Sequence, residues 1–368
     1  MILESKTSLL HTIRGFVPAL AFAVSMVAGV ASAQGQAAPG EPAAPRPQTP
    51  STVPSPVAPP PAKTDPLPPA NPKFFTATSP TVDTVNSFLH EIWGFDANRE
   101  WRVMAIQPTP APNVNRVVVF VSEKGPNAKV QAATFYVTPD GKHAIGDGVG
   151  VVNFGAHPFA DTRELLKERA NGAWRGAESK DFELVEFADL QCPHCKEAQA
   201  TMDQIAHDFP RAHVVFQFFP LVDIHPSAFK AAAYGICAQQ VSNEAFFKFA
   251  SGVFDTQEAL TASTDDTILK AAAMRAGLDG DKIAACAATQ ATKDAVNADI
   301  QLGKDAGVDQ TPLLSVNGRM LPLTTAFPYE QIKLIIQYQA TLDGVDSGAT
   351  AETLAPKPVQ PKLENLPK

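Results

Sequence analysis

Residues 184–202 read LVEFADLQCPHCKEAQATM and combine three local patterns in order. The apolar run Leu184 to Phe187 is typical of a buried strand, and the apolar residues that follow Cys192 to Cys195 recur at the spacing of one helix face. A Cys-x-x-Cys pair is also half of a zinc site, but such a site needs further ligands at close spacing, and Cys237 and Cys286 are each isolated. Strand, cysteine pair and helix in this order therefore predict redox chemistry.

The position of the two cysteines predicts different roles for them. Free N–H groups and the positive end of the dipole at a helix N-terminus stabilise an anion, so we expect Cys192 to be a reactive thiolate. Cys195, one turn into the helix, is the expected resolving thiol. Pro193 suits the first helical turn, where its missing N–H has no partner, and His194 is expected to supply a donor or a positive charge beside the thiolate. A stabilised thiolate predicts an oxidising site. We expect no metal, and no cofactor other than the redox-active Cys192–Cys195 disulfide.

A second signature, GVDQTPLLSVNG, occupies residues 307–318. An apolar strand followed by Asn-Gly indicates a hairpin. With the cysteine motif, this segment makes residues 181–343 resemble the DsbA-like branch of the thioredoxin superfamily. The resemblance implies an α/β thioredoxin fold with a helical insertion, preceded in this chain by a small α+β domain. It further implies that Pro312 follows a cis peptide bond beside the cysteine motif, and that Thr311 helps to hold an extended substrate.

The same resemblance implies a buried acid on the strand before the motif. Glu186 is the candidate, because burial would raise the pKa of its carboxyl and let it exchange a proton with Cys195. Asp189 is an alternative for this role, and a solvated strand residue is the alternative interpretation of Glu186.

The insertion is predicted at about residues 221–303, after a strand over 213–219. One helical element within it is expected over 281–303. Cys237 and Cys286 fall on its helices, and we expect them to form a structural disulfide, with two buried free thiols as the alternative.

The two ends of the chain differ in composition from its middle. Residues 1–33 resemble a signal peptide, in which basic residues precede an apolar stretch and the small residues Ala-Ser-Ala at 31–33 follow it. An uncleaved membrane anchor is the alternative. Residues 34–73 are rich in Pro and Ala and are expected to be an extended linker, and 344–368 a disordered tail. Export predicts a periplasmic or secreted protein, membrane-anchored if the signal is retained, in which disulfides persist.

A small α+β unit is expected over residues 74–158, with a helix near 81–93 and several strands after it. Residues 159–180 are expected to be a connecting helix and linker, the helix being capped by Asp161 or Thr162. The stretch 134–143 weakly resembles the end of the N-terminal domain of DsbC/DsbG isomerases, in which that domain forms a dimer.

The formal net charge of -8, without a long basic run, argues against nucleic acid as a partner. Three functions remain: a dithiol oxidase, a dimeric isomerase or reductase, and a non-enzymatic periplasmic chaperone or binding protein. The expected partners are unfolded or thiol-containing exported proteins and a membrane redox partner that reoxidises or reduces the site. A homodimer through the N-terminal domain is the further expectation of the isomerase hypothesis.

Overall fold

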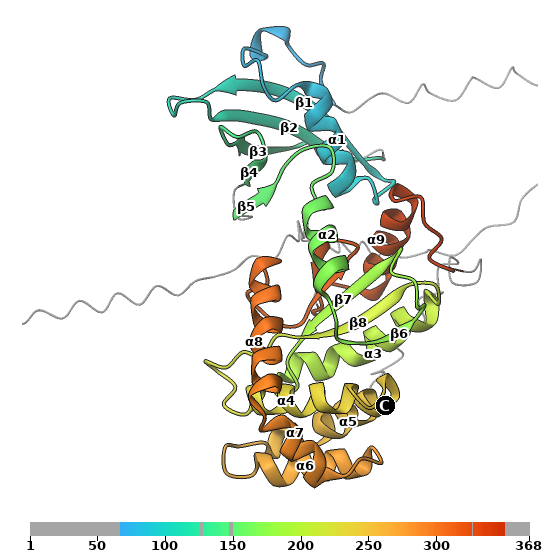
Figure 1. Cartoon of the computed structure of the whole chain (residues 1–368). Helices are drawn as coiled ribbons and strands as arrows, with labels where there is room; N and C mark the ends of the chain where they lie inside the picture. The colour runs from blue at the N-terminus through green and yellow to red at the C-terminus, as the bar shows by residue number, and fades with distance from the viewer. Residues whose placement is uncertain (1–66, 126–127, 147–149, 326, 350–368) are drawn as a thin grey trace, which may run out of the picture.

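The computed structural model describes residues 67–125, 128–146, 150–325 and 327–349. The predicted signal peptide, nearly all of the linker and most of the tail lie outside these residues. Figure 1 shows a small sheet at the top, a second sheet in the middle and a group of helices at the bottom. No helix within the described ranges is long and apolar enough to cross a membrane.

The N-terminal unit is an antiparallel meander of five strands in the order β1-β2-β3-β4-β5, preceded by a short 3-10 helix and by helix α1, Val82–Trp93. The helix begins where the Thr81 side chain accepts a hydrogen bond from the N–H of Thr84. Val85, Phe88 and Leu89 of α1 pack against alternate residues of the strands, which leaves the opposite face of the sheet free of a helix. The elements are η1 Pro72–Phe74, β1 Arg99–Pro108, β2 Asn115–Glu123, β3 Gln131–Val137, β4 His143–Gly146 and β5 Gly150–Asn153.

The connecting segment differs from the prediction in two ways. Helix α2, Ala160–Arg169, begins before the expected caps Asp161 and Thr162; its N-cap is Phe159, and no side chain caps it. Residues Ala173–Gly176 form strand β6, which pairs with strand β8 of the second sheet, so the second domain begins before residue 181. A strand of four residues is too short to show a periodicity, and only its pairing defines it.

The second sheet has the order β10-β9-β7-β8-β6. Its centre is a parallel pair, β7 Glu183–Ala188 and β8 His213–Phe218, connected by helix α3, Pro193–Asp208. Every residue of both strands is buried, as expected of strands covered on both faces. The hairpin of β9 Leu313–Val316 and β10 Arg319–Pro322 adds antiparallel strands, and α9, Tyr329–Leu342, packs against the sheet.

The hairpin turn is the one predicted from the Asn-Gly pair. Asn317 and Gly318 have φ values of 46° and 98°, the left-handed conformation that these residue types tolerate best.

Five helices lie between β8 and β9 and form the insertion: α4 Ala228–Gln239, α5 Asn243–Thr256, α6 Asp265–Arg275, α7 Gly280–Ala287 and α8 Gln290–Asp305, with the short η2 Gln257–Ala259 after α5. The predicted helical element over 281–303 is two helices. Thr289 separates them, because its side chain accepts a hydrogen bond from the N–H of Thr292 and begins α8.

The N-terminal unit contacts the second domain through polar groups at the C-terminal end of α1. The guanidinium of Arg319, on β10, donates hydrogen bonds to the carbonyls of Glu91 and Ile92 in the last turn of α1. The hydroxyl of Tyr338, on α9, donates to the carbonyl of His90 at 2.6 Å. A cation at a helix C-terminus stabilises the free carbonyls there, so α1 is held on the second sheet by this end.

The start of the predicted tail is packed. Val345 and Ala349 contact the core beside α9, and the carbonyl of Ser347 accepts a hydrogen bond from the N–H of Arg211. The expectation of disorder from residue 344 is therefore wrong for 344–349. Isolated apolar residues in a Gly-rich stretch carry too little periodicity to predict such packing.

Candidate redox-active site

The two cysteines of the motif occupy the first turn of α3, immediately after β7. Cys192 is the N-cap of the helix and Pro193 lies in its first turn. Cys192 and Cys195 are free thiols, both buried, with exposed fractions of 4% and 0%. Among the residues that the structure describes, no group of three or more His, Cys, Asp or Glu is placed to hold a metal ion.

The surroundings of the two thiols shift their pKa values in opposite directions. The pKa of Cys192 is lowered to about 5, chiefly by the hydrogen bond with the Cys195 thiol and also by backbone N–H groups of the first helical turn. Burial raises the pKa of Cys195 well above its ordinary value, and the hydrogen bond to Cys192 adds to the effect. The pair therefore carries its negative charge on Cys192, at the less buried position.

The loop before β9 lies against the nucleophile. The Thr311–Pro312 peptide bond is cis, and the carbonyl of Thr311 accepts a hydrogen bond from the Cys192 thiol at 3.7 Å, across 119 residues of sequence. The Thr311 hydroxyl oxygen is buried beside the two thiols and lowers the pKa of both. The fold thus brings together the two motifs that the sequence pointed to, Cys192–Cys195 and Thr311–Pro312.

His194 faces solvent. Its side chain is 73% exposed, and its ring nitrogen pairs with the carboxylate of Glu197 at 3.1 Å, which raises the pKa of the imidazole. The ring bonds to Glu197 rather than to the Cys192 thiol.

Glu186 is buried below the helix. It lies on β7 with 1% exposure, and desolvation raises its pKa to about 7. Its carboxylate accepts a hydrogen bond from the Gln199 amide at 2.8 Å, and the same amide donates to the carbonyl of Cys195 at 3.0 Å. Gln199 was not singled out in the sequence. Its place one helical turn after Cys195 is the signal that it faces the sheet.

Replacing Glu186 with glutamine is expected to remove part of the pH dependence of stability. Between its ordinary pKa of 4.5 and its folded value of about 7, the folded protein binds more protons at this carboxyl than the unfolded chain does. The free energy of unfolding therefore falls as pH rises through this window, by about 3 kcal/mol in all, and the glutamine variant lacks this loss. Urea unfolding at pH 5 and pH 8 measures it.

The matched control is Glu244→Gln, at a carboxylate that is 76% exposed. It should lose as much stability between the two pH values as the unmodified protein. An equal loss in Glu186→Gln would contradict the buried, protonated state of Glu186.

Asp189 is also fully buried, and its carboxyl group has three polar partners. Its carboxylate lies 2.7 Å from the ring nitrogen of His225 and accepts hydrogen bonds from the N–H groups of Gln191 and Leu221. These contacts join the loop after β7 to the loop after β8.

The helical insertion supports the cysteine loop from the other side. The side-chain amide of Gln257, which is buried in η2, donates hydrogen bonds to the carbonyls of Leu190 and Cys192. The side-chain amide oxygen of Gln191 accepts a hydrogen bond from the N–H of Ser227, which precedes α4. No sequence pattern singles out Gln191 or Gln257, because each contact spans more than thirty positions of the chain.

A cavity of about 360 Å³ opens beside His194. Helix α3 contributes one wall, and the loop between β10 and α9, together with the start of α9, contributes the other. The lining includes Glu197, Ala198, Leu323, Phe327, Tyr329 and Ile332.

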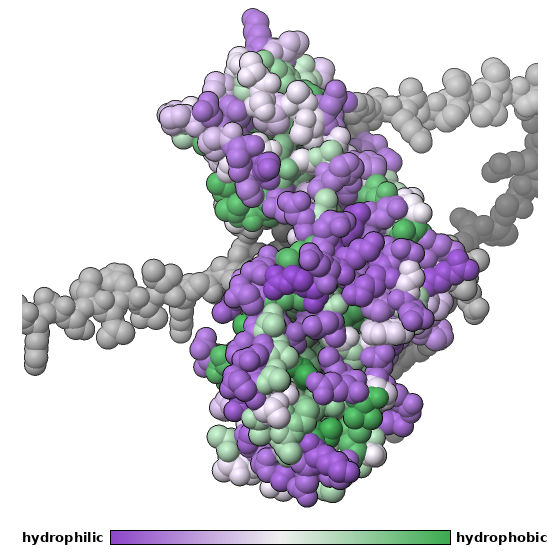
Figure 2. Space-filling model, in the orientation of Figure 1, coloured by the Kyte–Doolittle hydropathy of each residue, from purple (hydrophilic) through white to green (hydrophobic). Residues whose placement is uncertain are grey.

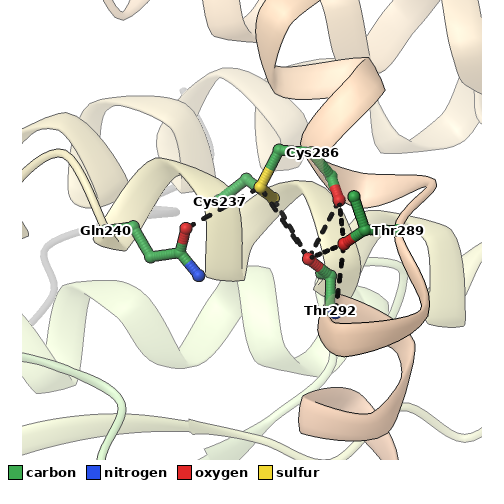
Figure 3. The surroundings of a disulfide bond; sticks show 5 residues. All are labelled: Cys237, Gln240, Cys286, Thr289 and Thr292. Carbon is green, nitrogen blue, oxygen red and sulfur yellow. Dashed lines mark hydrogen bonds between the residues drawn. A yellow bond between two sulfur atoms is a disulfide. The ribbon is translucent and has the colours of Figure 1, made fainter.

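Cys237 and Cys286 form a disulfide between α4 and α7, as Figure 3 shows. Their Cα atoms are 6.1 Å apart, and the bond joins residues separated by 49 positions. The hydroxyl of Thr292 lies 3.7 Å from the Cys237 sulfur and 3.8 Å from that of Cys286, so the bond lies where α4, α7 and α8 meet.

A parallel β–α–β unit with a cysteine pair at the start of its helix, facing a cis-proline loop, defines a thioredoxin-type dithiol domain. Residues 168–337 match the family model described as Thioredoxin. The five helices α4–α8 lie between β8 and β9, where the resemblance to the DsbA-like branch had predicted a helical insertion.

Curated relatives match the chain over part of its length. It is 28% identical over 145 residues to "Na(+)/H(+) antiporter NhaA 3" of Salinispora tropica, covering 39% of this chain and 21% of that protein. It is 30% identical over 147 residues to "Na(+)/H(+) antiporter NhaA 1" of Mycolicibacterium vanbaalenii, covering 39% of this chain and 23% of that protein. The chain thus spans only 21% to 23% of the length of these two relatives.

Solved structures also match. A thioredoxin-like oxidoreductase from Silicibacter pomeroyi aligns with 49% of this chain and 98% of its own, at 19% identity and a TM-score of 0.42. BdbD from Bacillus subtilis aligns with 46% and 93%, and the thiol-disulfide exchange protein alpha-DsbA2 from Wolbachia pipientis with 49% and 96%. Both have 19% identity and a TM-score of 0.41.

Proposed function

We propose that this protein is an exported thiol:disulfide oxidoreductase, and that it works as a dithiol oxidase. The observation that carries the proposal is the opposite shift of the two thiols, with the pKa of Cys192 lowered to about 5 and that of buried Cys195 raised. A stable thiolate is a good leaving group, so a disulfide formed by Cys192 is easily reduced and readily passes to another protein.

The proposed reaction starts from the oxidised Cys192–Cys195 pair. A substrate thiolate attacks the sulfur of Cys192, the Cys192–Cys195 bond breaks, and the electron pair leaves on Cys195, which takes up a proton. A second substrate thiolate then attacks the substrate sulfur of the mixed disulfide and releases Cys192 as a thiolate. The substrate dithiol loses two electrons and the protein gains them.

The surrounding residues supply a role for each step. Glu186 has a pKa near the working pH and lies below Cys195, so we assign it the proton that Cys195 takes up. Thr311 and Pro312 border Cys192 and are assigned to hold the extended substrate. In the reverse direction Cys195 resolves the mixed disulfide.

The stabilisation of the thiolate is large enough to matter for the direction of exchange. A pKa of about 5 against an ordinary value of 9.0 corresponds to a difference on the order of 5 kcal/mol between the charged and neutral forms of Cys192. A difference of this size favours the reduced form of the pair and therefore favours donation of the disulfide.

The experiment is the redox equilibrium of the Cys192/Cys195 pair in glutathione buffers, with Cys192→Ala as the control. We expect the pair to be reduced at glutathione ratios that leave thioredoxin oxidised. A potential at or below that of thioredoxin would refute the oxidase assignment and favour a reductase or isomerase that is kept reduced. Cys192→Ala could also bind unfolded proteins as tightly as the unmodified protein does. If in addition the unmodified protein exchanged no disulfides, the result would favour the non-enzymatic binding protein.

The location and partners belong to the same proposal. The signal-like residues 1–33 would place the protein in the periplasm or outside the cell, where exported proteins with unpaired thiols are the substrates. Each turnover leaves the pair reduced, so a membrane redox partner must reoxidise it.

One observation favours the dimeric isomerase as a second candidate. Tyr136, Ile145 and Val151 lie side by side across β3, β4 and β5, on exposed positions with fractions of 40%, 40% and 65%. Figure 2 shows hydrophobic surface where Figure 1 labels β5, at the free edge of the sheet. Sedimentation equilibrium tests it: a dimer that Val151→Lys dissociates would support the isomerase, and a monomer would remove this support.

A further inference from the structure

Glu186 shares one face of the second sheet with an arginine. Glu186 on β7 lies opposite Phe216 on β8, and Phe216 lies opposite Ala173 on β6. Arg175 follows Ala173 by two residues, and side chains two positions apart on a strand point to the same face. Strand β6 therefore places a cation over the face on which the buried carboxyl lies.

Two contacts hold the guanidinium of Arg175. Its Nη1 atom lies 2.5 Å from the carboxylate of Asp203, on α3, and its Cζ atom lies 4.9 Å from the centre of the Phe247 ring, on α5. The Nε atom is buried, with no hydrogen-bond partner among the described residues. Asp203 is 68% exposed and Arg175 only 24%, so the positive charge is fixed where the surface meets the interior.

Helix α3 connects this ion pair with the redox site. Cys195, Gln199 and Asp203 are four residues apart and therefore lie along one side of the helix. The Gln199 amide binds the carbonyl of Cys195 and the carboxylate of Glu186 together. The resolving thiol, the buried acid and the ion pair with Arg175 thus follow one another along α3.

Arg175 and Asp203 are the two charged side chains that act on Glu186. Burial is the main cause of the raised pKa of Glu186; the charge of Arg175 lowers this pKa and that of Asp203 raises it. The nearby Cys195 thiol is neutral, because burial raises its pKa. Other ionisable side chains on the surrounding elements have partners of their own: Glu183 with Lys180, Asp189 with His225, Asp208 with Tyr329 and Lys333, Asp265 with Lys230, and Glu244 with Lys248.

The proposed chemistry needs Glu186 to ionise as well as to hold a proton. When Cys195 resolves a mixed disulfide, Glu186 takes the proton of the Cys195 thiol and the freed sulfur attacks the sulfur of Cys192. The bond between Cys192 and the partner sulfur breaks, and the electron pair leaves on the partner thiolate. Burial without compensation keeps a carboxyl protonated, and a protonated carboxyl cannot accept this proton.

We infer that Arg175 is a positioning residue, whose fixed charge makes the carboxylate form of Glu186 accessible and so lets it exchange a proton with Cys195. An arginine suits this role because its guanidinium keeps its charge throughout the working pH range. The inference rests on the proposed function, since it concerns the proton assigned there to Glu186.

The first test removes the charge and keeps the length of the side chain. Arg175→Met should raise the pKa of the Glu186 carboxyl by about one unit, and Arg175→Lys, which keeps a charge, should raise it by much less. Carbon NMR of protein with isotope-labelled glutamate carboxyls measures the titration. The Glu186 resonance is assigned by its absence in Glu186→Gln.

The second readout is the pH profile of the resolving step. In Arg175→Met the midpoint of this profile should move up with Glu186, so the rate at pH 6 should fall about tenfold, because about tenfold less Glu186 is ionised there. Stopped-flow oxidation of the reduced protein measures the step, at glutathione disulfide concentrations high enough for resolution by Cys195 to limit the rate.

Asp203→Asn separates charge from packing. It breaks the same ion pair but removes a negative charge, so it should lower the pKa of Glu186 while Arg175→Met raises it. Shifts in the same direction for both variants, or an unchanged titration in Arg175→Met, would overturn the inference. The matched control is Arg169→Met, at an arginine on α2 that pairs with Asp305 at 2.6 Å; it should change neither readout.

Failure of the proposed function gives a different result. The unmodified protein would then not act as an oxidant toward glutathione, whatever the titration of Glu186. Failure of this inference leaves the glutathione equilibrium of the unmodified protein as expected of an oxidase, with the Glu186 titration unchanged in Arg175→Met.

Discussion

Cys192→Ser is expected to abolish thiol–disulfide exchange at the site, because it removes the sulfur on which the mixed disulfide forms. With a pKa of about 5, roughly 99% of Cys192 is thiolate at pH 7, whereas a serine hydroxyl stays neutral there. The rate at which the oxidised protein accepts electrons from a model dithiol peptide measures the effect. No exchange above the uncatalysed background should remain.

Cys195→Ser is the informative partner variant. Cys192 keeps its place at the helix N-terminus, so a mixed disulfide with glutathione should form and persist, visible by mass spectrometry. In Cys195→Ala, which has no donor at this position, the midpoint of the Cys192 titration should rise, because the hydrogen bond from the Cys195 side chain is the main cause of its low pKa. If persistent mixed disulfides formed on Cys192→Ser and not on the Cys195 variant, Cys195 would be the nucleophile and Cys192 the resolving thiol.

Removing the second disulfide is expected to have the largest effect on stability. The Cys237–Cys286 bond closes a loop of 49 residues, for which the chain-entropy relation gives about 4 kcal/mol of stabilisation. The double variant Cys237→Ala/Cys286→Ala should lose a comparable free energy of unfolding, measured by urea denaturation. Because the bond joins α4 to α7, within the helical insertion, exchange at the site should continue below the lowered melting temperature.

Thr292→Val serves as the control for local packing. It removes the hydroxyl that lies near both sulfurs and keeps the bond, so it should cost far less than the loss of the bond. Loss of exchange in the folded double alanine variant would mean that this disulfide takes part in the redox reaction.

Local patterns predicted much of the site. The strand before Cys192, the helix after it and the Asn317-Gly318 turn all follow from contacts within a few residues of one another, so their signals lie in short stretches of sequence. The predicted pairing of Cys237 with Cys286 is present in the structure, and here the sequence supplied only two candidates.

Other features have no local signal. Strand β6 exists only because it pairs with β8, and α7 separates from α8 at a threonine that a continuous helical pattern conceals. The packed residues 344–349 depend on a surface formed by α9 and the loop at Arg211.

The sequence by itself determined that a strand, a cysteine pair and a helix follow one another, and therefore which sulfur begins the helix and which lies one turn inside it. Tertiary structure alone decided that Thr311 lies against Cys192 across 119 residues and His225 against Asp189 across 36. It also decided the burial of Glu186 and Asp189. Whether a carboxylate loses its water depends on everything packed around it, and this packing, rather than residue type, fixes its charge.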